Sequence, residues 1–185
     1  MFKFLRKDWK SITKNIYKGN TKKIIESTLR YFYRMRPPDG VKVVEEDWDY
    51  LVILDACRYD FFEDAYHERK WLEGKLSKKT SRGSTSVEWL NRNFTDHYDD
   101  IVYITGNAFV SPIDCRHGHY KRKQFDSNQH FHNVYPLYME DDMQDGNVTR
   151  PEDITEKAKE VSKRYPNKRI IVHYMQPHEP YIGEK

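Results

Sequence analysis

Reactive side chains stand at the ends of two short apolar runs. Asp55 directly follows Tyr50–Leu54, and His173 and His178 follow the run 170–172. Short apolar runs of this kind predict strands that are buried on both faces, as in parallel sheets. Open α/β sheets bind their ligands at the carboxyl ends of such strands. These three side chains are therefore candidates for ligand contact, and for Asp55 the alternative is a cap on the following helix.

A second group of candidates lies in the turn "GSTS", residues 83–86, which leads into a predicted helix. Ser84 or Thr85 can be the N-cap, and Glu88 stands at the N3 position of a capping box with Thr85. A hydroxyl at a helix N-terminus lies among unpaired N–H groups and the positive end of the helix dipole. Phosphate or sulfate is favoured there, and so is the alkoxide of the hydroxyl. A capping role alone is the alternative.

Arg58 and Asp60 follow Asp55 within about one turn of a helix. The guanidinium could bind an anion, with the carboxylate orienting the site. The two side chains could equally pair with each other on the surface, where an ion pair contributes little.

The elements that must position these groups alternate along the chain. Strands are predicted at 49–54, 100–107 and 168–173, and helices from 59 toward 71, within 81–94 and at 151–165. This alternation predicts an α/β fold, with a parallel sheet and helices on both of its faces.

Residues 107–150 show little hydrophobic periodicity, which indicates a long functional loop or a poorly ordered segment. They contain "CRHGH" (115–119) and "HFH" (130–132), one cysteine and four histidines in close sequence. Zinc takes such ligands, but the spacing matches no zinc finger. A solvated loop, or one that contacts substrate, is the alternative.

The N-terminal segment 1–36 is strongly basic. It has eleven Lys or Arg against Asp8 and Glu26, which gives +9 and leaves −6 for the other residues of a chain with net charge +3. Apolar residues recur near helical spacing, at Phe4, Leu5, Trp9, Ile12 and Ile16 and again at Ile24, Ile25, Leu29, Phe32 and Tyr33. We predict an arm of one or two amphipathic helices, ended by "MRPPDG" at 35–40. The arm either contacts an anionic surface or packs on its own domain or a second subunit.

Composition restricts the class of protein. No stretch approaches the roughly 20 apolar residues of a membrane span, and the N-terminus lacks the apolar centre of a secretory signal. Two cysteines, Cys57 and Cys115, are too few for a disulfide framework. We therefore expect a cytoplasmic protein, or one held peripherally at the inner membrane surface. Nucleic-acid binding is not expected, because the basic residues are confined to the arm and no recognised reading motif accompanies them.

Three motifs together resemble the sulfatase-like branch of the alkaline phosphatase superfamily: "LVILDACRYD" (51–60), the Gly-x-Thr-Ser turn and "HYMQPHEPY" (173–181). The resemblance covers about residues 47–183. It implies an incomplete alkaline-phosphatase-like parallel-sheet core in residues 41–185. It also implies that Asp55 binds a divalent cation (Zn, Mn, Mg or Ca), and that Thr85 is the nucleophile and a second metal ligand, with Ser84 as runner-up. His178 matches the substrate-binding histidine of the His-x-Pro-Tyr element, and His173 and Arg58 are further candidates for binding the ester oxygens.

The resemblance implies a metal-dependent hydrolase or transferase that acts on phosphate or sulfate esters, with water or a glycan or lipid hydroxyl as acceptor. The Cys/Ser-x-Pro/Ala-x-Arg motif of formylglycine sulfatases is not matched at Cys57, Ser84 or Cys115, which favours phosphate. Family members supply further metal ligands downstream, whereas this chain ends about four residues after Tyr181. We therefore expect the N-terminal portion of a longer enzyme. The alternative is a catalytically inactive module that binds a polyanion or a membrane surface.

Overall fold

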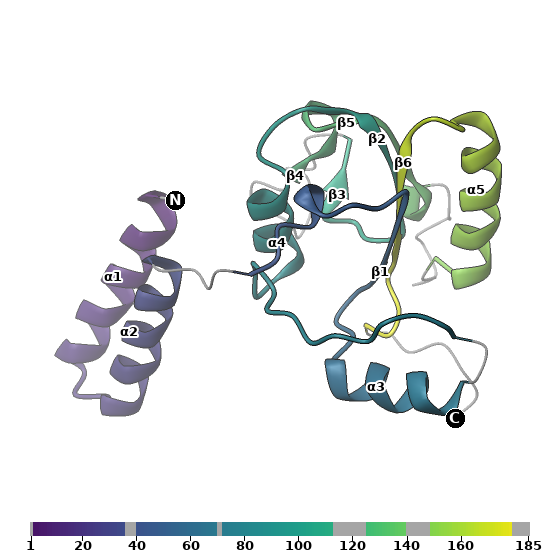
Figure 1. Cartoon of the computed structure of the whole chain (residues 1–185). Helices are drawn as coiled ribbons and strands as arrows, with labels where there is room; N and C mark the ends of the chain where they lie inside the picture. Colours follow the sequence, from purple (N-terminus) through teal and green to yellow (C-terminus); the bar gives the residue numbers. More distant parts are fainter. Residues whose placement is uncertain (1, 36–39, 70–71, 113–124, 140–148, 179–185) are drawn as a thin grey trace. The chain divides into compact units, whose positions relative to one another are not determined.

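A computed structural model describes residues 2–35, 40–69, 72–112, 125–139 and 149–178 (Figure 1). The chain divides into two compact units, residues 1–41 with 80–82, and residues 42–79 with 83–185. The division falls close to the breaker at 35–40, where the sequence predicts a boundary. Residues 80–82 belong to the first unit, because the Val41 N–H donates to the carbonyl of Thr80 (3.1 Å).

The first unit contains two packed helices, α1 (Phe2–Tyr17) and α2 (Thr21–Met35). Gly19, in the turn between them, has a φ of 61°, a left-handed conformation that glycine adopts without a Cβ clash. Asn20 then caps α2 by accepting a hydrogen bond from the Lys23 N–H (3.1 Å). Of the one or two helices that the sequence predicts here, the structure has two. Among the described residues, no helix has the length and apolar character needed to cross a membrane.

The second unit is built on a parallel sheet with the strand order β1-β6-β2-β5. In that order the strands are β1 (Tyr50–Leu54), β6 (Arg169–Tyr174), β2 (Tyr98–Thr105) and β5 (Phe131–Pro136). The predicted α/β class is confirmed, and three of these strands are predicted within two residues at each end. The central strand β6 is buried from Ile170 to His173, as expected for a strand covered on both faces.

β5 lies inside residues 107–150, where the sequence predicts no regular element. It is an edge strand, and its polar positions His132 and Asn133 interrupt the apolar pattern. Two short strands of the same segment, β3 (Val110–Ser111) and β4 (Phe125–Asp126), pair with each other in a second small sheet. The segment thus contributes to the fold, although parts of it lie outside the described residues.

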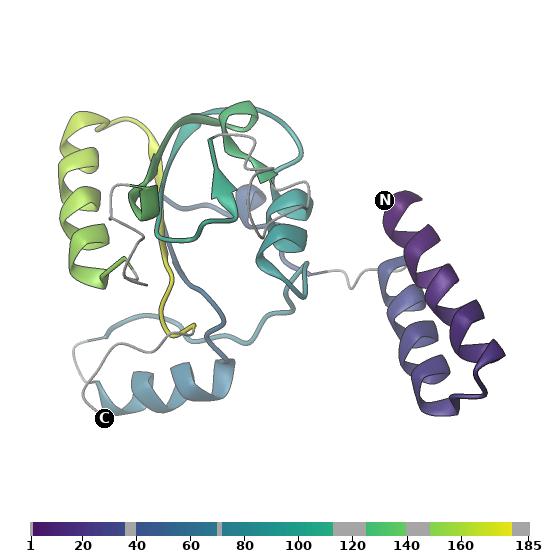
Figure 2. The ribbon, with the colours of Figure 1, turned by 180° about the vertical axis from the view of Figure 1, so that it is seen from behind.

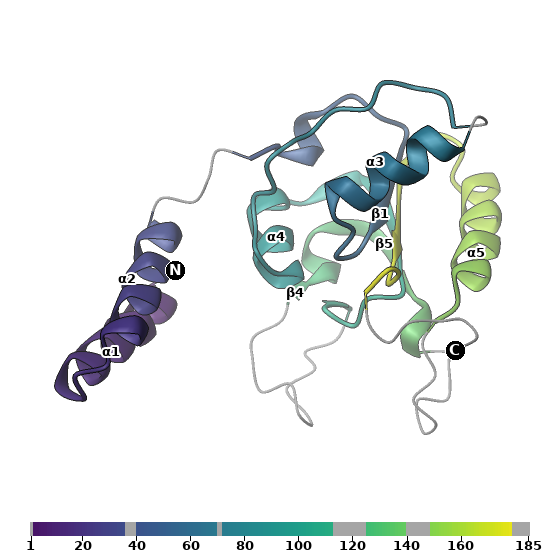
Figure 3. The same cartoon turned by 90° about the horizontal axis from the view of Figure 1, so that it is seen from below.

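Helices cover the middle of the sheet from both sides. The helices of this unit are α3 (Tyr59–Glu68), α4 (Ser86–Asn93) and α5 (Pro151–Arg164), with 3-10 turns at Val43–Glu45, Ser127–Gln129 and Leu137–Met139. α4 and α5 lie on opposite sides of the sheet in both Figure 1 and Figure 3, and again from behind in Figure 2. Ile154 and Val161 of α5 pack against Ile170 and Val172 of β6.

The edge strand β1 departs from the prediction of helices on both faces. Leu51 and Ile53 pack against the core on the α4 side. Tyr50, Val52 and Leu54, which alternate with them, are exposed. Among the described elements, α5 contacts β6 and β2, so this helix covers the central strands of its face, and the side chains of β1 on the same face are exposed.

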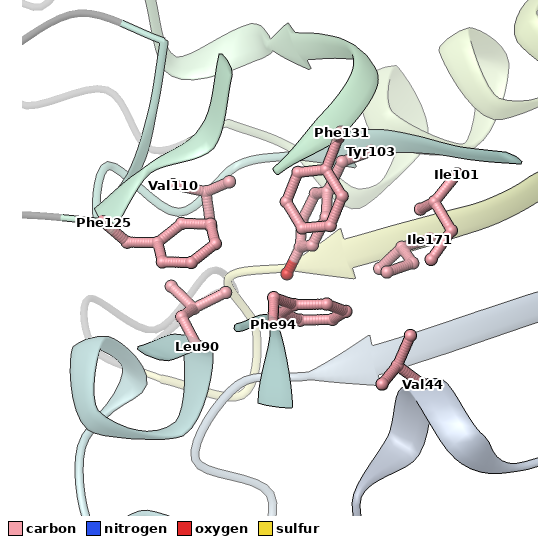
Figure 4. Packing of buried hydrophobic residues seen from close by; sticks show 9 residues of the cluster. All are labelled: Val44, Leu90, Phe94, Ile101, Tyr103, Val110, Phe125, Phe131 and Ile171. Atoms are coloured by element: carbon pink, nitrogen blue, oxygen red, sulfur yellow. The ribbon is translucent and has the colours of Figure 1, made fainter. Parts of the chain in front are cut away.

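An aromatic core fills the space between α4 and the sheet. Nine buried residues from the helix, the strands and the 3-10 turn at 43–45 form this cluster (Figure 4). Phe94 lies within it, with its ring 4.9 Å from that of Phe131, 5.8 Å from Trp89 and 6.2 Å from Tyr103. Edge-to-face geometries of this kind add to the burial energy of each ring. Phe94 therefore ties the end of α4 to β2 and β5.

Phe94→Ala should lower the free energy of unfolding by about 3–5 kcal/mol, because it removes a buried ring and leaves a cavity. Phe61→Ala is the matched control: this phenylalanine is 63% exposed on α3, and its loss should cost less than about 0.5 kcal/mol. Urea unfolding followed by circular dichroism measures both. Equal effects of the two substitutions would contradict this account of the core.

Candidate functional site

The carboxyl ends of three neighbouring strands bring polar side chains together. The Asp55 N–H donates to the carbonyl of Tyr174 at the end of β6 (3.1 Å), and the Gly106 N–H donates to the carbonyl of His173 (3.0 Å). Asp55 after β1, His173 in β6 and Asn107 after β2 therefore lie at one edge of the sheet. Parallel α/β sheets bind ligands at this edge.

Two neutral side chains hold the Asp55 carboxylate. Asn107 Nδ2 donates to Oδ2 at 2.5 Å, and Ser86 Oγ donates to the same oxygen at 3.2 Å. Asn107 is itself fixed, because its Oδ1 accepts from the Phe109 N–H (2.8 Å) and its own N–H donates to Thr105 Oγ1 (2.8 Å). Neither donor carries a charge, so the carboxylate is oriented without being paired to a cation by them.

Asp55 does not cap the following helix, since the N-cap of α3 is Arg58. The next residue, Ala56, has a φ of 59°. A residue with a Cβ adopts this left-handed conformation only at a cost, and such strained positions cluster at functional sites. The turn after β1 therefore presents Asp55 toward its partners at the expense of backbone strain at Ala56.

His173 is a buried, neutral member of the site. Its side chain is 2% exposed, its Nδ1 is hydrogen-bonded to the Tyr103 hydroxyl (2.9 Å), and its Nε2 lies 3.8 Å from Asp55 Oδ2. Burial lowers the pKa of His173 to about 4, although the Asp55 charge acts in the opposite direction. Near neutral pH the imidazole of His173 is therefore neutral.

Tyr103 supports His173 from within the core. Its side chain is buried, and burial together with the charge of Asp55 raises the pKa of its phenol well above the ordinary value. The phenol therefore stays neutral, and it fixes the orientation of the His173 ring through Nδ1.

The hydroxyl turn has a different hydrogen-bond pattern from a reciprocal capping box. Thr85, one of the two predicted candidates, is the N-cap of α4, and its Oγ1 accepts from the Glu88 N–H (3.3 Å). The Glu88 carboxylate, however, accepts from the N–H (2.9 Å) and the hydroxyl (2.7 Å) of Ser84. Ser84 and Thr85 are exposed, while Ser86, the first residue of α4, is the one that reaches Asp55. The turn thus presents three hydroxyls, and each has a different environment.

The other predicted ester-binding residues lie on the surface. Arg58 and Asp60 pair with each other, Nη2 to Oδ2 at 2.5 Å, and both side chains are exposed. The Arg58 guanidinium also lies over the Phe61 ring, 5.1 Å from its centroid. His178 is exposed in the turn after β6, where its N–H donates to the carbonyl of Met175 (3.0 Å). The rest of the predicted His-x-Pro-Tyr element lies outside the described residues.

Histidines of the 107–150 segment that the structure describes take part in the fold. His130 stacks on Phe125 at 4.4 Å between ring centroids, and its Nδ1 lies 2.9 Å from the carbonyl of Asp96. His132 Nδ1 lies 2.9 Å from Asp99 Oδ1. Cys115 and the two histidines of "CRHGH" lie outside the described residues, so the conceivable zinc site there stays a prediction.

Sequence reasoning missed Ser86, Asn107 and Tyr103. Asn107 follows the β2 strand just as Asp55 follows β1, so the rule that singled out Asp55 would have found it as well. Ser86 is one residue beyond the Thr85 favoured by the resemblance. Nothing in the sequence marks Tyr103 as a site residue, because a tyrosine in an apolar strand is ordinarily expected to be part of the hydrophobic core.

The residues present fit a divalent cation in a limited way. Among the described residues, no cluster of three or more His, Cys, Asp and Glu side chains could hold a metal ion. The Asp55 carboxylate, hydroxyls of the α4 turn and the unpartnered Nε2 of His173 are nevertheless donors of the types that such cations take. Asp55 is the one charged donor among these, and its hydrogen-bond partners leave its charge uncompensated.

Comparisons with protein-family models, with curated proteins and with solved structures found no match to this chain.

Proposed function

We propose that the chain is a metal-dependent enzyme that hydrolyses or transfers phosphate esters, with sulfate esters the less favoured substrates, on an alkaline-phosphatase-like core. The observation that carries the proposal is the hydrogen bond from Ser86 to Asp55 (3.2 Å). It joins the start of α4, where an anionic group is favoured by unpaired N–H groups and the helix dipole, to a carboxylate at the ligand edge of the sheet.

Thr85 is the proposed nucleophile. Its hydroxyl lies at the N-cap of α4, is exposed, and is adjacent in sequence to the Ser86 that contacts Asp55. Attack by the deprotonated Thr85 Oγ1 would form an O–P bond and break the bond from phosphorus to the ester oxygen, which would take up a proton and leave as the alcohol. Water or an acceptor hydroxyl would then lose its proton and take the phosphoryl group from Thr85, whose oxygen leaves. The acceptor is water in a hydrolase and a glycan or lipid hydroxyl in a transferase.

The remaining residues of the site would hold the cation, orient the Asp55 carboxylate and bind the ester. Asp55 and Thr85 would hold the divalent cation, which when bound supplies a Lewis acid that favours the alkoxide. Asn107 and Ser86 fix the carboxylate of Asp55 by their hydrogen bonds. His178 is exposed near the end of β6, where it can bind the non-bridging oxygens of the ester.

Thr85→Ala should lower turnover of an aryl phosphate monoester or diester by several orders of magnitude, because the covalent route is lost. It should lower the free energy of unfolding by only about 1 kcal/mol, the usual cost of a lost cap. Steady-state assays with added Zn²⁺, Mn²⁺ or Mg²⁺ measure turnover, and urea unfolding measures the free energy of unfolding.

Ser84→Ala is the matched control, since Ser84 is also an exposed hydroxyl of the same turn. Near-normal turnover in Thr85→Ala with a loss in Ser84→Ala or Ser86→Ala would move the nucleophile to that serine. Turnover that survives all three substitutions, or that no cation supports, would contradict the proposed function.

A second proposal concerns the α1–α2 hairpin, which we infer docks on an anionic membrane surface. On α1, Trp9 (57%) and Ile16 (58%) are exposed seven residues apart, and on α2 the exposed apolar positions are Ile25, Leu29 (63%) and Phe32. Each set recurs at helical spacing and so lies on one stripe of its helix. The Trp9 ring lies 6.0 Å from that of Tyr31, which in turn lies 5.9 Å from Phe32, so the two stripes are linked across the hairpin.

Charge favours a membrane over a second copy of the chain as the occupant of this face. Among the side chains of the hairpin that the structure describes, the exposed lysines are Lys10, Lys14, Lys18, Lys22 and Lys23. Two such basic hairpins repel each other, whereas anionic headgroups attract the lysines, and the apolar part of the interface accepts the tryptophan ring. The catalytically inactive alternative, a module that only binds such a surface, rests on the same observation.

Vesicles that contain phosphatidylserine should co-sediment the chain at low salt and lose it as salt rises, because surface attraction is screened within about 10 Å at 0.1 M. Leu29→Asp should weaken this binding, while Thr13→Asp, an exposed polar position on α1, should weaken it less because it removes no apolar contact. Equal binding to neutral and anionic vesicles would contradict the proposal, and so would a salt-resistant dimer that masks the hairpin.

A further inference from the structure

We infer that Nε2 of His173 is a ligand of the same cation as Asp55. The inference rests on the proposed function, which places a divalent cation at Asp55, and it assigns His173 to the metal rather than to the ester oxygens. It starts from an unpartnered atom: Nε2 is fully buried and has no hydrogen-bond partner among the described residues.

Burial argues against direct contact between His173 and a substrate. The ring is 2% exposed, and its Nδ1 is occupied by the Tyr103 hydroxyl. A buried ring nitrogen without a partner costs free energy, and native structures rarely leave one without a reason such as a bound ion. Nε2 is buried and lies 3.8 Å from Asp55 Oδ2, so this nitrogen faces the carboxylate of the site and not bulk solvent.

The distance between the two groups suits a shared ion. Nε2 and Asp55 Oδ2 are 3.8 Å apart, which is too long for a hydrogen bond. Two ligands that each lie about 2.0–2.1 Å from one tetrahedral ion are about 3.4 Å apart. A movement of a few tenths of an ångström would therefore let both atoms bind one cation.

The opposite side of the ring has the arrangement found in metal-binding histidines. Such a histidine donates its other N–H to an acceptor, which fixes the tautomer and the ring orientation. The Tyr103 oxygen is placed to accept from Nδ1 at 2.9 Å. When Nδ1 is the donor to the Tyr103 oxygen, Nε2 carries the lone pair, and a cation between Nε2 and Asp55 Oδ2, which lie 3.8 Å apart, would be bound by both atoms.

A nitrogen ligand also restricts the identity of the cation. Mg²⁺ and Ca²⁺ prefer oxygen donors, whereas Zn²⁺ readily takes imidazole and Mn²⁺ tolerates it. The mixed set of one imidazole, one carboxylate and hydroxyls therefore favours Zn²⁺ or Mn²⁺ over the other two candidates.

Zinc binding to the whole chain tests the assignment, by isothermal titration calorimetry and by long-range ¹H–¹⁵N NMR of the imidazoles. His173→Gln should weaken Zn²⁺ binding by at least about 10-fold, and Tyr103→Phe by about 10-fold, the effect of losing an outer partner of a ligand. In the wild type, Zn²⁺ should move the Nε2 resonance of His173 while Nδ1 stays protonated. Circular dichroism checks that each variant is folded.

Two controls separate this site from other histidines. His67→Gln changes an exposed histidine of α3, and His117→Gln with His119→Gln changes the "CRHGH" segment; none should alter the His173 resonance. If Asp55→Asn loses Zn²⁺ but His173→Gln binds as the wild type does, the inference is overturned while the proposed function stands. If Asp55→Asn also binds Zn²⁺ as the wild type does, both the inference and the proposed function are overturned. Should His173→Gln fail to fold, an unmoved Nε2 resonance in the wild type would by itself overturn the inference.

Discussion

The Asp55 carboxylate is the group on which the rest of the candidate site depends. A carboxylate that is mostly removed from water needs hydrogen-bond donors in the protein, because its hydration is lost. Here Asn107 and Ser86 donate to it, and the Asp55 N–H is tied to the end of β6. The three ties come from β2, α4 and β6, so one side chain fixes the relative positions of three elements. The left-handed φ of Ala56 is the local cost of this placement.

The aromatic core behind the site explains how such a polar group is held at a fixed position. Phe94 packs at the end of α4 against rings from β2 and β5, and Tyr103 connects this core to His173. Close-packed side chains have few alternative arrangements. The end of α4 is therefore held against β2 and β5, while at its start the Ser86 hydroxyl is bonded to Asp55.

The sequence predicted the elements whose signals are local and strong. The apolar runs before Asp55 and through His173 predicted β1 and β6, and the threonine cap of α4 follows from turn chemistry. β5 was missed because an edge strand carries polar side chains and has no clean period. The Ser86 contact was missed because helix geometry, not residue type, decides which of three successive hydroxyls turns inward. The exposed face of β1 could not be predicted either, since the sequence does not say which strand lies at an edge.

A single measurement tests most directly whether Asp55 organises a metal-dependent site: anomalous diffraction from crystals of the chain grown with Zn²⁺ or Mn²⁺. The account predicts an anomalous peak about 2.0–2.2 Å from a carboxylate oxygen of Asp55, with Ser86 and Asn107 still bonded to that carboxylate. A chain that binds the ion only elsewhere, for example through the Cys115 segment, while Asp55 keeps only its two neutral partners, would contradict it.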